Sequence, residues 1–256
     1  MINIQKYVRA QSLEEAYTLN QKKKNRILAG MLWTRMESVN VAVAIDLCDL
    51  GLDKIEENEE EFSIGAMVTL RQLQMHESFE NYCDGIVAKA VKDIIGVQFR
   101  NLATVGGSIW GRFGFSDVLT AFMALDTYVE LYKGGVIPLE QFARMQYDRD
   151  LLVRVIVKKK PGVFSYQAMR VQKTDFPILT CGVSRMDGVC KAVIGARPGK
   201  AVCIHDDRHL LDGEVTEKKA EAFAEYVAEQ VTTGSNMRGS AEYRTHLVKI
   251  LTGRGV

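Results

Sequence analysis

The chain has 256 residues, of which 47% are hydrophobic and 25% charged, the composition of an ordinary globular protein. Its 33 basic and 32 acidic residues give a formal net charge of +1, so there is no electrostatic signature of nucleic-acid or membrane-surface binding. This length allows one large domain or two modest ones, with a core that needs no disulfide bonds.

The first residues are polar, and no segment approaches the roughly 18 apolar residues that a membrane span needs. The cysteine count is odd and includes no CxxC pair, which predicts buried thiols in a reducing compartment. We therefore expect a cytoplasmic location. No cysteine spacing is typical of an iron–sulfur cluster. The five cysteines are Cys48, Cys83, Cys181, Cys190 and Cys203.

The first part of the chain predicts a β–α–β-like segment. Ser12 and Glu15 form a capping-box pattern that opens a helix running to residues 22–24. Short strands are expected at 26–29 and 41–47. Further elements are expected in chain order: strand 62–65, a helix capped at Thr69, helices 85–95 and 117–125, and strands 128–132 and 151–157.

Pro161-Gly162 is the best candidate for a domain boundary. Beyond it, strands at 164–170, 178–186 and 189–196 predict an antiparallel meander, with a hairpin turn at Asp187-Gly188. Two amphipathic helices follow. The fold class is therefore α+β in two parts. The two helices are expected at 216–231 and 241–251.

The stretch NLATVGGSIWGRFGFSDV, residues 101–118, carries the most specific signal. Gly106-Gly107 follows an apolar, β-branched run, and Thr104 and Ser108 flank the pair with hydroxyl groups. Glycine permits positive φ and close approach of a ligand, and successive backbone N–H groups in such a turn form a nest for a phosphate. Asp117 can accept ribose hydroxyls or cap its own helix. A bulge without a ligand is the alternative, because neither GxGxxG nor GK[ST] is present.

A second glycine loop strengthens the ligand interpretation. Residues 27–30, ILAG, predict another strand that ends in glycine, and Met31-Leu-Trp-Thr34 follows. Two such loops, far apart in the sequence, can face one elongated ligand. A dinucleotide with a central pyrophosphate fits this arrangement.

These segments resemble the FAD-binding subunit of the molybdenum hydroxylases, the family of xanthine dehydrogenase and carbon monoxide dehydrogenase. Residues 100–109, RNLATVGGSI, are similar to the family segment RNxATxGGNI, and residues 116–126 to SDLxPxxxALDA. Residues 64–70 resemble IGAxxTL, and residues 237–244 resemble RxSxxYR. The segments occur in the family's order and span nearly the whole chain.

The resemblance implies a two-subdomain FAD-binding fold of the vanillyl-alcohol-oxidase-like type over residues 1–160, with subdomains at about 1–54 and 55–160. A C-terminal α+β domain of antiparallel sheet and helices is implied for residues 161–256. The implied cofactor is FAD, and the implied partners are an iron–sulfur subunit and a molybdopterin subunit. Electrons would pass from the clusters to FAD and on to NAD or another acceptor. Because the cofactor carries the chemistry, no catalytic residue is expected.

The resemblance places the cofactor between two segments and one carboxylate. Asp117 is expected to approach the adenosine ribose. The two segments, carried over residue by residue, are Ala29, Gly30, Met31, Leu32, Trp33 and Thr34, and Thr104, Val105, Gly106, Gly107 and Ser108.

The first segment departs from the family pattern AGGT or GNT. Met31 and Leu32 replace a small or amide residue and a hydroxyl residue, which restricts φ and removes a hydrogen bond worth about 1 kcal/mol. Ser108 stands where many members have Asn. These changes motivate one alternative, a non-enzymatic assembly subunit with a decayed flavin site. A stand-alone flavoprotein reductase or oxidase is a weaker alternative, since the sequence offers no acid or base for a substrate pocket.

Four other side chains have two interpretations each. Trp33 and Trp110 lie beside the two loops and are expected either to stack on flavin or adenine, or to pack in the core or an interface. His205 and His209 have helical spacing but no evident third ligand, so we expect a surface turn and no metal site.

Two further pairs bear on the C-terminal part. We expect Cys181 and Cys190 to oppose each other, reduced, across the Asp187-Gly188 hairpin. Arg238 and Arg244 are expected to form salt bridges that hold the last helix.

Overall fold

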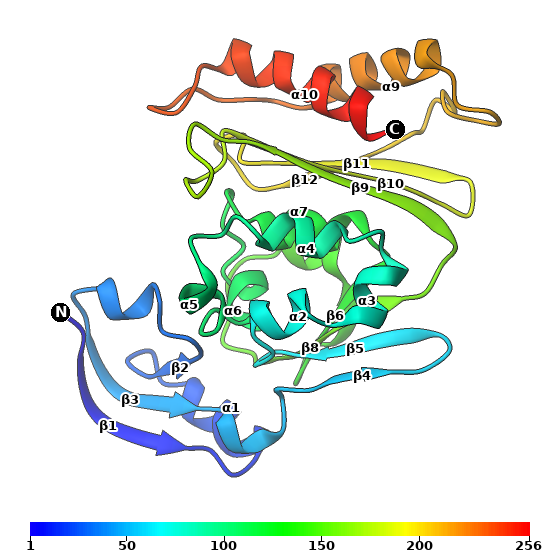
Figure 1. Cartoon of the computed structure of the whole chain (residues 1–256). Coiled ribbons are helices and arrows are strands. Elements are labelled where there is room, and N and C mark those ends of the chain that lie inside the picture. Colours follow the sequence, from blue (N-terminus) through cyan, green and yellow to red (C-terminus); the bar gives the residue numbers. More distant parts are fainter.

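The computed structural model describes residues 1–256 and contains three sheets (Figure 1). The first sheet is parallel, in the order β1-β3-β2, and consists of β1 (Asn3–Arg9), β2 (Arg26–Leu28) and β3 (Asn40–Asp46). Parallel strands need crossover connections, and α1 (Leu13–Asn20) connects β1 to β2, which lie on either side of β3. Ser12 caps α1, accepting the Glu15 N–H at 3.1 Å, as the capping pattern predicted.

The second sheet is antiparallel, with five strands in the order β4-β5-β8-β6-β7. Its strands are β4 (Ile55–Glu57), β5 (Glu61–Gly65), β6 (Thr127–Leu131), β7 (Gly135–Pro138) and β8 (Leu152–Lys158). A series of short helices lies between β5 and β6, and one more follows β7. The helices are α2 (Leu70–Gln74), α3 (Glu77–Tyr82), α4 (Ile86–Val91), α5 (Val97–Arg100), α6 (Val105–Trp110), α7 (Asp117–Ala124) and α8 (Leu139–Arg144).

The third sheet begins just after the expected boundary, at β9. It is antiparallel, in the order β12-β11-β10-β9, and two long helices follow it. The hairpin between β10 and β11 turns at Asp187 and Gly188, both with positive φ. The elements are β9 (Gly162–Met169), β10 (Leu179–Met186), β11 (Val189–Gly195), β12 (Val202–His205), α9 (Glu217–Gln230) and α10 (Ala241–Gly255).

The second and third sheets and their helices form alternating layers (Figure 1). Helices α9 and α10 cover the outer face of the third sheet, while α4 and α7 pack between the third sheet and the second. The largest core cluster, 36 buried residues, therefore crosses the Pro161-Gly162 boundary. Phe164 of β9, for example, packs on Tyr82 of α3 with ring centroids 5.8 Å apart.

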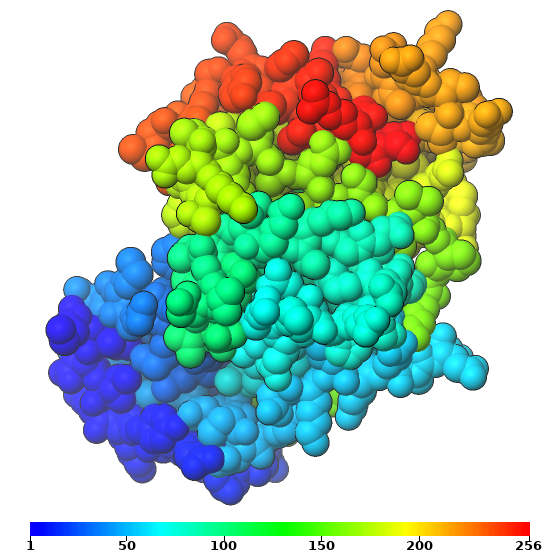
Figure 2. Space-filling model, in the orientation of Figure 1, coloured from blue at the N-terminus to red at the C-terminus, as the bar shows by residue number.

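The N-terminal residues form a lobe against this layered body, at the lower left of Figure 2. Two single turns complete the lobe, η1 (Thr34–Met36) and η2 (Cys48–Leu50). None of the helices is both long enough and apolar enough to cross a membrane.

One expected strand is absent. The run before Gly106-Gly107 is not a strand; Thr104 is the N-cap of α6, and both glycines lie in the first turn of that helix. The apolar, β-branched residues favoured a strand by composition. Thr104 instead accepts the Gly107 N–H at 3.1 Å, and this local cap initiates a helix.

The expected cysteine pairing across the hairpin is wrong. In the register of β10 and β11, Cys181 lies opposite Ile194, and Cys190 lies opposite Arg185. The hairpin turn itself is as predicted, but the pairing fixes partners equidistant from the turn, which these two cysteines are not. All five cysteines are free thiols, and all except Cys48 are buried.

The expectation for the last helix is confirmed for one arginine and wrong for the other. Arg238 pairs with Asp175 at 3.6 Å. Arg244 is fully buried and makes no salt bridge; its guanidinium donates to the backbone carbonyls of Ile178 (2.9 Å) and Gly234 (2.7 Å). It also donates to the Gly239 carbonyl and the Asn236 side chain, so it holds α10 through neutral acceptors.

Candidate functional site

A cavity of about 900 Å³ lies between the N-terminal lobe, the start of α6 and the segment after β9. Its volume is near the upper end of the range for small-molecule sites. Eleven of the twelve residues that the sequence assigns to the cofactor line it; the exception is Val105, which is fully buried in the core. The tertiary structure therefore brings together two segments some 70 residues apart.

The glycines in this site allow close backbone approach. A β-carbon on Gly106 would lie 2.5 Å from the carbonyl oxygen of Ala66, and one on Gly30 would lie 1.8 Å from the carbonyl oxygen of Leu102. Positive φ was the other expected reason for the glycine pair, but neither Gly106 nor Gly107 has it. Instead, Met31 in the first loop has a φ of 55°.

The first loop presents a row of free backbone donors. The N–H groups of Gly30, Met31, Leu32 and Trp33 donate no hydrogen bond within the protein, and all four residues line the cavity. Buried or half-buried N–H groups rarely stay unpaired without a ligand or water. Successive free N–H groups around a left-handed residue form an anion-binding nest. This geometry does not depend on the side chains of Met31 and Leu32.

In the second loop, residues 104–108, the backbone N–H groups from Val105 onward already donate hydrogen bonds within the protein. Val105 donates to the Val68 carbonyl and Gly106 to the Ala66 carbonyl, both at 2.8 Å, while Gly107 donates to the Thr104 hydroxyl. The Ser108 hydroxyl donates to the Thr104 carbonyl at 2.8 Å. The expectation that these N–H groups form the open nest is therefore wrong, because they start a helix and hold it against β5.

Asp117 sits at the cavity wall and is only 5% exposed. Its Oδ1 accepts hydrogen bonds from the Tyr166 hydroxyl and the Arg170 guanidinium, while Oδ2 has no side-chain partner. Burial raises the pKa of the Asp117 carboxyl, and the opposing attraction of Arg170 favours the ionised form. Sequence reasoning missed both partners, although Tyr166 and Arg170 are four residues apart along one predicted strand and so share a face.

Aromatic rings from three parts of the chain close one end of the cavity. Trp33 lies 6.0 Å from Phe176 and 5.9 Å from Phe115, measured between ring centroids. Phe113 stacks on Phe115 at 5.2 Å. Trp33 remains 42% exposed, so the cluster is not a closed core. Planar rings lining a cavity are well suited to a planar heterocycle.

The other tryptophan has a mixed environment. Trp110 lines the cavity and also packs on Phe142 of the core, with ring centroids 5.8 Å apart. The core-packing interpretation holds for Trp110, whereas Trp33 belongs to a half-exposed aromatic cluster. Both rings line the cavity.

The residues present fit a dinucleotide such as FAD. The nest at Gly30–Trp33 suits a pyrophosphate, the free Oδ2 of Asp117 suits a hydroxyl group, and the aromatic end suits a ring system. Fold and site together define a class of dinucleotide-binding proteins with a mixed α and β structure.

Comparison with known proteins gives the family. Residues 2–159 match the model of the FAD binding domain in molybdopterin dehydrogenase, and residues 164–256 match that of the CO dehydrogenase flavoprotein C-terminal domain. The chain belongs to this family of FAD-binding oxidoreductase subunits. FAD is accordingly its cofactor, and the resemblance noted in the sequence is confirmed.

Similar proteins cover almost all of the chain. The nicotine 6-hydroxylase medium subunit of Paenarthrobacter nicotinovorans is 24% identical over 98% of this chain and 95% of its own length. A putative xanthine dehydrogenase FAD-binding subunit of Escherichia coli is 27% identical over 74% and 70%. The quinoline 2-oxidoreductase structure from Pseudomonas putida has the same fold, with a TM-score of 0.86 at 21% identity over 98% and 94%.

Proposed function

We propose that this chain is the electron-transfer subunit of a molybdenum hydroxylase complex. In that complex, electrons would reach FAD from an iron–sulfur subunit, which receives them from a molybdopterin subunit, and would leave to NAD or another acceptor. The support is the family membership together with relatives whose names describe them as medium or FAD-binding subunits. A cytoplasmic location is part of the proposal, supported by the cysteine content of the sequence.

The free N–H groups of Gly30, Met31, Leu32 and Trp33 would hold the pyrophosphate, and they are the observation on which the proposal chiefly rests. The Thr104 hydroxyl accepts the Gly107 N–H, and its own proton would add one donor. The Oδ2 atom of Asp117 would accept a ribose hydroxyl while Arg170 keeps the carboxylate in place.

When bound, FAD supplies the electron-carrying chemistry, and the protein supplies binding, orientation and electrostatics. The aromatic cluster around Trp33 would exclude water from one end of the site. We propose that residues 1–160 form the flavin-binding unit, with the vanillyl-alcohol-oxidase-like arrangement of two subdomains, and that residues 161–256 close the site through the segment that carries Arg170 and Phe176.

The alternative of a decayed flavin site rested on Met31 and Leu32. It loses its motivation because the nest is built from backbone groups, and Met31 already adopts the left-handed conformation that the replaced glycine would permit. The stand-alone reductase alternative has no supporting observation.

Titration of the purified chain with FAD, followed by flavin absorption and tryptophan fluorescence, tests the proposal. We expect one FAD per chain and quenching of the tryptophans, since both line the cavity. A chain that fails to take up FAD, alone and with its co-expressed partner subunits, contradicts it. Adding NADH to the FAD-loaded chain then tests the acceptor, and bleaching of the flavin by NADH supports NAD. NAD is excluded if NADH leaves the flavin spectrum unchanged while dithionite-reduced flavin is reoxidised by other oxidants.

A further inference from the structure

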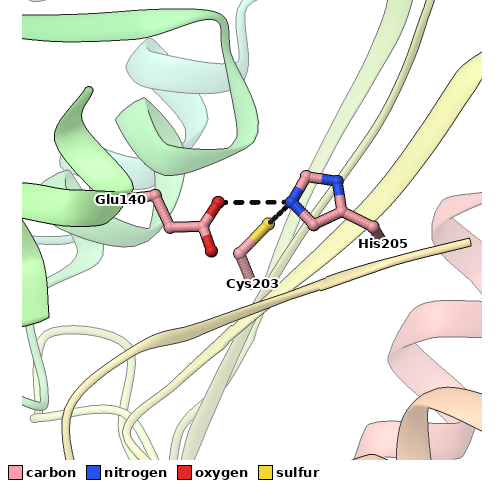
Figure 3. A group of neighbouring side chains, drawn as sticks. All are labelled: Glu140, Cys203 and His205. Carbon is pink, nitrogen blue, oxygen red and sulfur yellow. Dashed lines mark hydrogen bonds and ion pairs between the residues drawn. The ribbon is translucent and has the colours of Figure 1, made fainter. Parts of the chain in front are cut away.

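Three metal-ligating side chains from α8 and β12 point toward one another outside the FAD cavity (Figure 3). The Nε2 atom of His205 lies 3.5 Å from Sγ of Cys203 and 3.2 Å from Oε2 of Glu140. Cys203 and His205 are two residues apart on β12, so they share one face of the strand. Glu140 comes from the first turn of α8. None of the three lines the FAD cavity.

The separations match those of a tetrahedral zinc site. With Zn–S near 2.3 Å and Zn–N or Zn–O near 2.0–2.1 Å, tetrahedral angles place sulfur and nitrogen about 3.5 Å apart and nitrogen and oxygen about 3.4 Å apart. The observed values are 3.5 and 3.2 Å. The three ligand atoms already lie within 4.8 Å of one another, so a single ion needs little rearrangement.

The same geometry does not suit a catalytic triad in which Cys203 would be the nucleophile. A Cys–His–carboxylate relay uses the two ring nitrogens separately, one for the thiol and one for the acid. Here both Cys203 and Glu140 approach Nε2 of His205. Cys203 is also buried, which limits access of a substrate to its thiol. A bound metal ion would take the place of the thiol proton.

Two cationic side chains, Arg144 and Lys191, lie beside the cluster, and Lys191 donates to the Leu125 carbonyl at 2.9 Å. Arg144 donates to Oε1 of Glu140 at 2.6 Å, which orients the carboxylate and leaves Oε2 directed at His205. The side chains of His205 and Glu140 are 42% and 31% exposed, so an ion can enter from solvent and keep a water as its fourth ligand. Cysteine, histidine and a carboxylate together favour Zn²⁺ over the harder Mg²⁺ or Ca²⁺.

We propose that Glu140, Cys203 and His205 form a Zn²⁺ site that ties α8 to β12. The site would link the segment before the Pro161-Gly162 boundary to the sheet after it, and so stabilise their shared interface. It revises the sequence-based expectation of no metal ligand: His205 has a partner on β12 and another on α8, whereas His209 lies beyond the strand and pairs with Asp212.

Metal titration of the chelator-treated full chain tests this. Zn²⁺ is added in competition with a chromophoric chelator, and Co²⁺ is used as the spectroscopic probe. We expect one ion per chain, a thiolate-to-cobalt charge-transfer band, tetrahedral visible bands and a higher melting temperature with Zn²⁺. Cys203→Ser should abolish the charge-transfer band, and difference spectra against this variant remove any flavin absorption. His205→Gln and Glu140→Gln should weaken Zn²⁺ binding at least about tenfold.

Cys48→Ser and His209→Gln are matched controls, because each removes a thiol or an imidazole outside the cluster. They should bind Zn²⁺ like the parent. The proposal is overturned if the parent chain takes up no stoichiometric ion at micromolar concentration, or if the ligand variants bind as tightly as the controls. Should Cys203→Ser fail to fold, as judged by circular dichroism, the two partly exposed ligands still decide the question.

Discussion

Gly30 packs against the backbone carbonyl of Leu102, and a β-carbon at Gly30 would lie 1.8 Å from that oxygen. This contact fixes the first loop of the FAD site against the segment that leads into α6. Both partners are backbone atoms, so neither can move aside as a flexible side chain does. The distance between the two loops therefore depends on one residue without a side chain.

Gly30→Ala should separate the two loops and weaken FAD binding by at least tenfold, with a loss of stability of about 1–3 kcal/mol from overpacking. Gly253→Ala in α10 is the matched control, because its new methyl group would meet only Ala224 of α9, at 3.7 Å. The control should be neutral or slightly stabilising. FAD titration and chemical denaturation of both variants give the answer, and equal FAD affinities would contradict the role of Gly30.

Met31 has a φ of 55°, which a β-branched residue adopts only with strain. Met31→Ile should therefore distort the nest and lower FAD affinity at least tenfold. Met31→Gly should keep the affinity within tenfold of the parent, because the backbone N–H groups stay in place. The two Kd values, measured by fluorescence titration, separate a backbone site from one that depends on the methionine side chain. A large gain in affinity for Met31→Gly would instead revive the decayed-site interpretation.

Glu80 of α3 accepts the Ala88 N–H through Oε2 at 2.9 Å, while its buried Oε1 has no partner. Burial raises the pKa of Glu80 from 4.5 to about 7. Between these values the folded chain binds the proton more tightly than the unfolded chain, so the free energy of unfolding should fall as pH rises from 4.5 to about 7.

Glu80→Gln should remove that slope and, above neutral pH, stabilise the chain by about 1–2 kcal/mol, a figure reduced for the partial exposure of the group. Urea denaturation across this pH interval provides the measurement. Glu77→Gln, an exposed neighbour in α3, removes the same charge and should leave the slope intact. A parallel pH profile for Glu80→Gln and the parent would show that this carboxyl is not responsible.

Arg244 is fully buried and its guanidinium serves three backbone carbonyls and Asn236. Arg244→Met removes all these donors and should cost more than about 3 kcal/mol, because several buried acceptors lose their partner together. Arg254→Met, an exposed position on the same helix, should change stability by less than about 0.5 kcal/mol. Thermal melting of the two variants tests the difference, and similar melting temperatures would refute the structural role of Arg244.

Features decided by a few neighbouring residues were predictable. The caps at Ser12 and Thr69 and the hairpin turn at Asp187-Gly188 are formed within four residues, so the sequence alone contains both partners of each contact. Helix ends were predicted less well than these starts: the helix expected at 85–95 ends at Val91. Several short elements, β7, α5 and β12 among them, were missed because four residues carry little periodicity.

The ordered motifs also identified the cofactor family, and eleven of the twelve residues assigned to the cofactor line the cavity, while Val105 faces the core. They did not reveal which loop carries the free donors. That assignment depends on what the N–H groups of Gly106 and Gly30 meet. Gly106 meets Ala66, about 40 residues away, whereas the N–H of Gly30 meets no protein acceptor.

By itself, then, the sequence determined where helices start, where the chain turns, the change of sheet near Pro161 and the family of the chain. Each of these depends on a short residue pattern or on the order of such patterns. Only the tertiary structure decided the partners of Asp117 and Arg244 and the meeting of Glu140 with Cys203 and His205. Those contacts join residues that lie as much as 66 positions apart, and for Asp117 and Arg244 burial makes the pairing obligatory. Nothing in the local pattern of either partner specifies the other.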